Sequence, residues 1–230
     1  MNKFVHLHCH SPFSFLDGAS EIEDLVQRAV EMEMPALAIT DHDNLCGAVK
    51  FSRAAQSAGI KPVQGVEVTL EGGGHLTLLA QSPRGYSSLC QLLTHAHLNN
   101  LRGEPVVTLA ELDKIKDVIV LSGCRQGILA PLILQGRYRE AAEQVIFYRD
   151  LLGKEQFYIE LQNTLLPGDR YLNHRLLELA QQVGVEVVAS NNVHYAHHQE
   201  FFLHDLLTCV RTLTMVEEVH RERPLNGENY

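Results

Sequence analysis

Short hydrophobic runs alternate along this chain with longer segments in which hydrophobic residues recur at helical spacing. Most of the short runs predict buried strands, since a strand covered on both faces is almost continuously apolar. The predicted strands lie at residues 4–10, 36–39, 62–68, 76–80, 118–121, 157–161 and 186–189. The amphipathic segments predict helices at residues 20–34, 45–59, 86–99, 108–114, 138–152, 167–183 and from 197 onward.

The alternation of seven predicted strands with helices predicts an α/β fold with parallel strands and right-handed crossovers. Polar residues follow the carboxyl ends of several strands, which is where barrels of this type carry their functional side chains. We therefore expect a closed or nearly closed TIM-like barrel, one strand short of the regular eight. Ser20 with Glu23 and Thr108 with Glu111 predict capping boxes, and Asp43 is expected to cap a helix.

The first predicted strand carries three histidines at alternate positions: His6, His8 and His10. On a strand these imidazoles share one face, and neighbours two residues apart lie roughly 7 Å from each other. They could converge on one metal ion or on adjacent ions. The alternative is a strand that carries histidines on the surface. Three buried imidazoles without a cation would be hard to satisfy, so the pattern favours a metal.

Five further candidate ligands follow predicted strands. His42, Glu67, Cys124 and His194 lie at or near carboxyl ends of strands, and Asp17 lies in the loop after the first strand. Each type of side chain can bind a divalent ion. Other interpretations stay open: Asp17 could belong to a turn, Glu67 could form a salt bridge, and Cys124 could be a small buried residue.

Three other residues complete the set of candidates. His97 is expected on the hydrophobic face of the helix at 86–99, where it could reach a metal or be an ordinary core histidine. Asn192 lies two residues before His194, and Arg125 follows Cys124 as a candidate phosphate-binding residue. One zinc ion takes four ligands, so this set suits two or three divalent ions: Zn, Mn, Fe or Mg. Clustered ions bind phosphate oxygens and activate water for phosphoester hydrolysis.

Composition narrows the location and the partners. The net charge of −9 excludes a general electrostatic attraction to nucleic acid or membrane, so any phosphate would be held locally. The five cysteines form no Cys-x-x-Cys pair and no secretory leader is recognised, which predicts a reducing cytoplasm. No hydrophobic run has the length of a membrane span.

Several short motifs together carry a resemblance to a known family. Residues 7–11 (LHCHS), 40–43 (TDHD), 65–67 (GVE), 122–124 (SGC) and 192–194 (NVH) resemble the motifs of the polymerase and histidinol phosphatase (PHP) superfamily. Residues 15–18 (FLDG), 60–62 (IKP) and 122–127 (SGCRQG) are similar to the N-terminal PHP domain of bacterial DNA polymerase III alpha subunits, above all the error-prone branch. The resemblance covers essentially residues 1–230 as one PHP domain.

The resemblance implies a distorted (βα)7 barrel with a trinuclear metal site and phosphoesterase chemistry, of the 3′–5′ exonuclease or pyrophosphate-hydrolysing type. It implies metal ligands at His8, His10, Asp17, His42, Glu67, His97, Cys124, Asn192 and His194. Of these, His8, His10, His42, Glu67 and His194 are the expected catalytic residues. It implies a DNA or nucleotide phosphate substrate, and other polymerase domains or subunits as partners.

Three departures from the family pattern leave alternatives open. Asn192 stands where the superfamily usually has Asp, and a neutral amide is a weaker ligand. Cys124 replaces a common histidine, and His6 replaces a common Asp and is expected to support the ligands. The alternatives are a histidinol-phosphate type phosphatase, or a non-catalytic, metal-stabilised platform for the polymerase and a proofreading partner. The sequence is expected to be an N-terminal fragment of a longer polymerase or a stand-alone paralogue.

Overall fold

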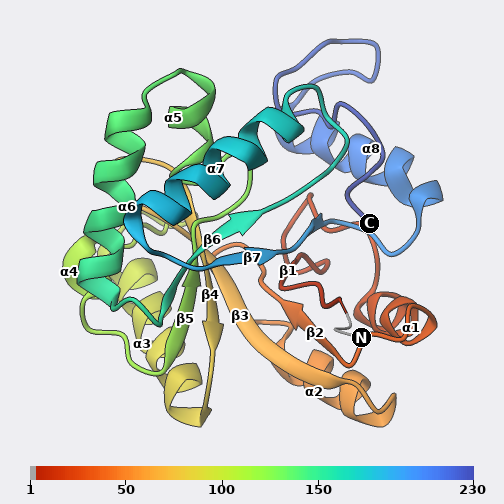
Figure 1. Ribbon diagram of the computed structural model, residues 1–230. Coiled ribbons are helices and arrows are strands. Elements are labelled where there is room, and N and C mark those ends of the chain that lie inside the picture. The colour runs from red at the N-terminus through yellow and green to blue at the C-terminus, as the bar shows by residue number, and fades with distance from the viewer. Residues whose placement is uncertain (1–3) are drawn as a thin grey trace.

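The strands curl around a common axis with helices outside them in the computed structural model, which describes residues 4–230 (Figure 1). One sheet contains, in order, β2 (Ala36–Ile39), β3 (Lys61–Thr69), β4 (His75–Ala80), β5 (Val118–Leu121), β6 (Phe157–Leu161) and β7 (Val187–Ala189). A second pairing joins β1 (His8–Cys9) to β8 (Asn192–Val193), which lies just after β7 in the chain. Backbone hydrogen bonds of 2.9 and 2.8 Å from Ala38 and Thr40 to the carbonyls of His6 and Cys9 place β1 beside β2. The predicted TIM-like α/β barrel is therefore confirmed.

The expected all-parallel arrangement is wrong at β4, which runs antiparallel to both β3 and β5. The reason is the short connection between β3 and β4. A parallel pair needs a crossover of a dozen or more residues, whereas antiparallel neighbours can be joined by a tight turn. Gly72, Gly73 and Gly74 form that turn. Their φ values are 87°, 100° and 80°, which residues other than glycine rarely adopt.

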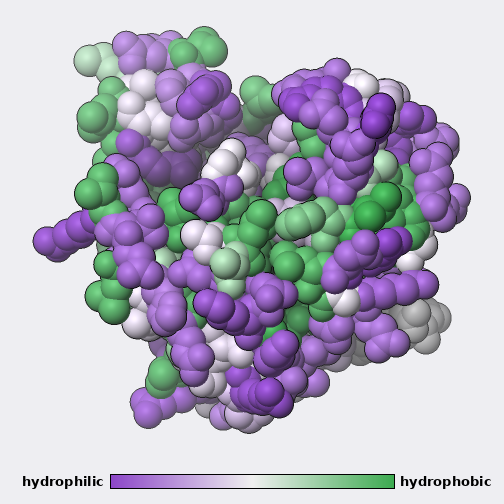
Figure 2. Space-filling view, turned by 90° about the vertical axis from the view of Figure 1, so that its left-hand side faces the viewer, coloured by the Kyte–Doolittle hydropathy of each residue, from purple (hydrophilic) through white to green (hydrophobic). Residues whose placement is uncertain are grey.

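The helices pack on the outer face of the barrel. They are α1 (Ile22–Glu31), α2 (Ala48–Ser57), α3 (Pro83–Asn99), α4 (Leu109–Leu112), α5 (Ala130–Leu134), α6 (Tyr138–Leu152), α7 (Asp169–Val183) and α8 (Phe201–Thr212), with a 3-10 turn at His198–Glu200. The helix α5 was not predicted. The side that carries α3 to α6 is largely hydrophilic, interrupted by hydrophobic patches (Figure 2). Among residues 4–230, no helix is long and apolar enough to cross a membrane.

One of the two predicted capping boxes is present. Thr108 and Glu111 form it at the start of α4, as predicted. The prediction of a capping box at Ser20 is wrong, because α1 begins after Glu21. The Ser20 hydroxyl instead donates a hydrogen bond to Glu200 and accepts one from the Ala196 amide. Asp43 is not a helix cap either, because α2 begins only at Ala48. Its carboxylate accepts hydrogen bonds from the amide and hydroxyl of Thr69, and so ties the loop after β2 to the end of β3.

Inside the barrel, the side chains that point to the axis change from apolar to polar along the strands. Ala38, Leu79 and Leu121 form a small hydrophobic cluster toward one end. Glu67, Thr77 and Glu160 are buried toward the other end, where the carboxyl ends of β3 and β6 lie. The alternation of strand residues between two faces fixes this placement, since β6 points Tyr158 and Glu160 inward. The polar end of the barrel holds the candidate site.

Candidate metal centre

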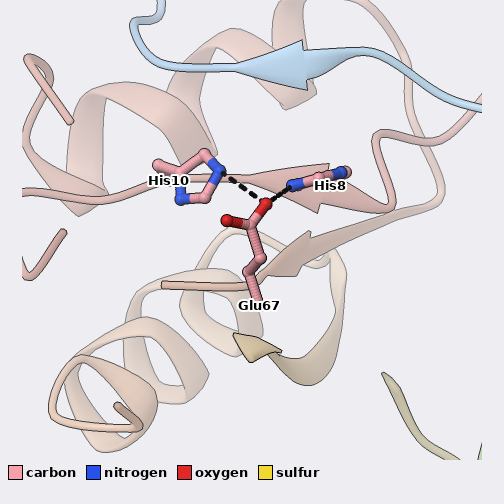
Figure 3. A group of neighbouring side chains, drawn as sticks. All are labelled: His8, His10 and Glu67. Atoms are coloured by element: carbon pink, nitrogen blue, oxygen red, sulfur yellow. Dashed lines mark hydrogen bonds and ion pairs between the residues drawn. The ribbon is translucent and has the colours of Figure 1, made fainter. Parts of the chain in front are cut away.

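Glu67 is the central carboxylate of the site. Its Oε2 atom lies 2.7 Å from His8 Nε2 and 4.0 Å from His10 Nε2 (Figure 3). The same oxygen lies 3.3 Å from His75 Nε2, and Oε1 lies 2.7 Å from His42 Nδ1. Burial favours the neutral acid, yet His75 and His42 hold the pKa of Glu67 well below its ordinary value. One buried carboxylate from β3 therefore faces imidazoles from three other parts of the chain.

A second buried carboxylate orients His8. Glu160 Oε1 lies 3.1 Å from His8 Nδ1, and the Thr77 hydroxyl lies 3.2 Å from the same nitrogen. Burial opposes protonation, but the charges of Glu160 and Glu67 raise the pKa of His8 to about 10. Gln162 donates a 2.6 Å hydrogen bond to Glu160. Nδ1 is thus engaged behind the ring, and Nε2 is left directed at Glu67, as in histidines that bind metals.

Asp17 gathers a second group of side chains. Its Oδ2 atom lies 2.9 Å from His42 Nε2 and 3.0 Å from His194 Nδ1, and its Oδ1 atom lies 3.3 Å from Arg211. Burial opposes ionisation, but His194 and His42 hold the pKa of Asp17 well below its ordinary value. The backbone carbonyl of Asp17 accepts a 2.8 Å hydrogen bond from His204 on α8. Asp17 is therefore a fixed anion between the barrel and α8.

His10 lies between these two carboxylates. Its ring stacks on those of His42 and His194, with centroids 4.3 and 4.8 Å apart. Its Nε2 atom lies 3.0 Å from Asn192 Oδ1. Burial and the neighbouring imidazoles of His42 and His194 lower the pKa of His10 well below its ordinary value. A lowered pKa favours the neutral imidazole, which is the form that binds metals.

A buried aspartate holds the loop that carries Asp17. Asp41 accepts hydrogen bonds of 2.7 Å from the amide and hydroxyl of Ser11 and from the hydroxyl of Ser14. These bonds occupy both carboxylate oxygens, so Asp41 supports the site instead of lining it. The loop after β1 is fixed by the loop after β2, and Asp17 is presented to His42 as a result.

The donor atoms form overlapping groups. Within residues 4–230, four sets have donor atoms within 4.8 Å of one another: His8–His10–Glu67, His10–Asp17–His42, Asp17–His194–His204 and Glu67–His75–Cys124. Neighbouring sets share His10, Asp17 or Glu67, as expected of ligands that serve more than one ion. The His194 Nδ1 atom is buried and faces Asp17 Oδ2 at 3.0 Å without a well-aligned hydrogen bond, so the two atoms could share a cation. The imidazole, carboxylate and thiol donors fit divalent transition metals.

The structure brings most of the predicted ligands together, but not His97. His97 is exposed, and its Nε2 atom lies 2.7 Å from the carbonyl oxygen of Asp43. The hydrophobic face of α3 is centred on Leu89, Leu92, Leu93 and Ala96, and His97 lies about 100° past Ala96. His97 therefore borders the loop after β2 and lies outside all four donor groups.

His6, predicted to support the ligands, and Arg125, predicted to bind phosphate, both have other contacts in the structure. The chain bends at Leu7, so β1 is short and His6 does not share a face with His8. His6 lies beside Arg28 instead, and burial together with this charge lowers the pKa of His6 to about 4. Arg125 lines the cavity at the site, but its guanidinium is held by Asp169 at 2.5 Å and by the Pro167 carbonyl at 3.1 Å.

His75 and His204 were not predicted as part of the site. His75 opens β4, with its Nε2 atom 3.3 Å from both Glu67 Oε2 and Cys124 Sγ. It alternates with Thr77, and Thr77 is opposite Glu67 in the antiparallel register, so a hairpin at the three glycines would have placed it at the site. His204 was expected on a solvated or ordinary helical surface. It is buried together with Thr208, which lies one turn further along α8. This face of the helix therefore points inward.

We expect Asn192→Asp to raise metal affinity at least about tenfold. The Asn192 oxygen already lies 3.0 Å from His10 Nε2, so a carboxylate at this position would add a charged ligand without a change of shape. Metal content per chain after dialysis at graded free-metal concentrations measures the effect. Asn191→Asp is the matched control, because Asn191 binds the carbonyl of Glu228. Equal metal affinity in Asn192→Asp and the wild type would contradict the expectation.

The family model for the PHP domain matches residues 6–164. An error-prone DNA polymerase from Symbiobacterium thermophilum is 49% identical over an alignment that covers 99% of this chain and 22% of that protein. A DNA polymerase III subunit alpha from Borreliella burgdorferi is 31% identical, with coverage of 100% and 21%. The chain thus spans about a fifth of the length of these relatives. The predicted resemblance is confirmed.

Solved structures share the fold at low sequence identity. An amidohydrolase from Chromobacterium violaceum, with bound sulfate and no metal, aligns with a TM-score of 0.61 and 17% identity over 83% of this chain and 87% of that chain. Histidinol phosphate phosphatase from Lactococcus lactis, complexed with zinc, L-histidinol and phosphate, aligns with a TM-score of 0.53 and 14% identity over 99% and 98%. These likenesses establish the barrel fold.

Proposed function

This chain belongs to the PHP domain family, and from that premise we propose that it is a metal-dependent phosphoesterase domain of an error-prone-type DNA polymerase. The substrate is a phosphodiester at a DNA 3′ end or a pyrophosphate released from nucleotides. The observation that carries the proposal is the set of overlapping donor groups linked through Glu67, His10 and Asp17. Phosphoester hydrolysis uses such clusters, since adjacent cations can bind the attacking and leaving oxygens.

The ligands we propose are His8, His10, Asp17, His42, Glu67, His75, Cys124 and His194, with Asn192 as a weak ligand and His204 beside Asp17. Two or three divalent ions held there would supply Lewis acidity to the phosphate. The protein fixes the donors: Glu160 holds His8, and Asp41 holds the loop of Asp17. His97 is not included in this set, because its imidazole binds the Asp43 carbonyl.

The proposed partners follow from the relatives. DNA polymerases that match this chain are about five times as long, so the polymerase domains of a longer protein are the proposed partners of this domain, and DNA is the proposed substrate. The five cysteines are all free, which supports the proposed location in a reducing cytoplasm.

The test is hydrolysis by purified protein reconstituted with Mn²⁺ or Zn²⁺. The substrates are a 5′-labelled primer with a mismatched 3′ end, pyrophosphate and p-nitrophenyl phosphate. We expect nucleotide or phosphate release that requires metal and is lost in His42→Ala. Release from p-nitrophenyl phosphate alone would favour a small-molecule phosphatase. If metal-loaded protein hydrolyses no substrate, the non-catalytic platform remains as the function. The neutral Asn192 side chain favours this alternative.

A further inference from the structure

Four arginines line the cavity that contains the metal ligands. The cavity has a volume of about 520 Å³, and Asp17, His42 and Glu67 are among the residues that form its wall. The arginines are Arg125, Arg211, Arg221 and Arg223. The chain as a whole carries a net charge of −9, so this concentration of guanidinium groups in one cavity differs from the overall charge of the protein. Such an arrangement attracts an anionic ligand.

Two of these arginines are engaged by other parts of the protein. Arg223 forms hydrogen bonds of 2.8 and 2.6 Å with the two carboxylate oxygens of Asp205, and it also donates to the Val216 and Glu218 carbonyls. Arg125 is held by Asp169 and the Pro167 carbonyl, as described above. Both guanidinium groups are structural links, so neither is free to bind a ligand without breaking buried or bidentate contacts.

The remaining two arginines differ in depth. The Arg221 side chain is 88% exposed, and its nearest described carboxylate, that of Glu222, lies 3.9 Å away. The Arg211 side chain is 35% exposed, and its Nη2 atom lies 3.3 Å from Asp17 Oδ1. The other oxygen of Asp17 faces His42 and His194, so Arg211 lies at the edge of the donor groups. A guanidinium has five N–H donors, and the contact with Asp17 uses one nitrogen.

We propose that Arg211 is the residue that binds the substrate phosphate, in place of Arg125. The inference rests on the proposed function, in which a phosphate oxygen is held at the donor groups of Asp17 and Glu67. A phosphate so placed would lie within reach of Arg211, whose planar fork matches phosphate oxygens. The helix α8 thus contributes a specificity-determining residue, and oxyanions of phosphorus are the ligand class it selects.

A structural role for Arg211 would have the opposite effect on metal binding. If Arg211 served to hold Asp17 in place, its removal would weaken the binding of metal. If Arg211 binds phosphate, its removal takes a positive charge away from a metal ligand, so metal affinity stays the same or rises while phosphate affinity falls. The two roles are therefore separated by two binding measurements that need no catalysis.

The experiment titrates inorganic phosphate into the full chain loaded with Mn²⁺, and follows binding by calorimetry. The variants are Arg211→Gln, the conservative Arg211→Lys and the matched control Arg221→Gln. We expect Arg211→Gln to weaken phosphate binding about tenfold or more, Arg211→Lys to weaken it less, and Arg221→Gln to change it less than about twofold. Metal affinity, measured by Mn²⁺ titration of each variant, should be unchanged or higher in Arg211→Gln.

Three results would overturn the inference: unchanged phosphate affinity in Arg211→Gln, an equal loss in Arg221→Gln, or a parallel loss of Mn²⁺ affinity. Absence of phosphate binding by Mn²⁺-loaded wild type would overturn it as well. The proposed function fails separately. Arg211-dependent phosphate binding without hydrolysis would retain the phosphate site and reject the enzyme. Hydrolysis with the same KM in Arg211→Gln and wild type would retain the proposed enzyme and reject the phosphate site at Arg211.

Discussion

Glu67→Gln is expected to lower phosphoester hydrolysis about a thousandfold and to reduce metal content per chain. The carboxylate of Glu67 lies within 4.0 Å of His8, His10 and His75, and its second oxygen lies 2.7 Å from His42. An amide keeps the shape but loses the charge shared by two donor groups. Metal ions supply several kcal/mol of transition-state stabilisation, and each 1.36 kcal/mol corresponds to a tenfold change in rate.

The measurement combines elemental analysis with the hydrolysis assay on Glu67→Gln. Glu71→Gln is the matched control, since Glu71 lies exposed in the turn after the same strand. Circular dichroism establishes that both variants fold. A Glu67→Gln protein with full metal content and undiminished activity would show that the donor groups do not share ions through this residue.

Removal of metal is expected to lower the melting temperature by about 8–16 °C for each tightly bound ion. A ligand at a thousand times its Kd stabilises the folded state by about 4.1 kcal/mol. For a chain of this length, 1 kcal/mol shifts the melting temperature by about 2–4 °C. The physical reason is the burial of Asp17 and Glu67 among histidines, where a cation offsets the cost of the buried charges.

Thermal unfolding of the metal-loaded protein, before and after chelation, measures this shift. Glu67→Gln should show a smaller shift, because it begins with less metal. A change below about 2 °C, with elemental analysis confirming that metal had been removed, would contradict the expectation. The result does not depend on catalysis, so it applies equally to an active enzyme and to a platform.

Strand periodicity was sufficient to predict most of the fold and the proximity of several candidate ligands. His42, Glu67 and His194 come at or just after the carboxyl ends of hydrophobic runs, and the barrel topology places such positions at one end. Their proximity in the structure follows from that rule alone. His8 and His10 lie side by side in the structure for a related reason, because alternate residues on a strand share a face.

The missed residues depend on contacts that periodicity does not contain. His75 reaches Glu67 because β4 turns back at three glycines, and the prediction treated every strand as parallel. His97 was expected at the site because the boundary of the hydrophobic face of α3 was placed one residue too far. The ion pairs of Arg125 and Arg211 join segments that are far apart in the chain, at Asp169 and Asp17. Only the folded barrel reveals that Arg125 is held by two partners, whereas Arg211 contacts Asp17 through one nitrogen.

The strand β8 carries Asn192, is followed directly by His194, and lies between β1 and the segment around Asn229. His10 donates its amide to the Val193 carbonyl at 2.8 Å, and Asn229 contacts the backbone of both His194 and Asn192, at 2.8 and 3.0 Å. A displacement of the segment around Asn229 must therefore pull directly on two candidate ligands. By reciprocity, ions that hold Asn192 and His194 also restrain that segment, so metal occupancy and the position of the segment around Asn229 are thermodynamically linked.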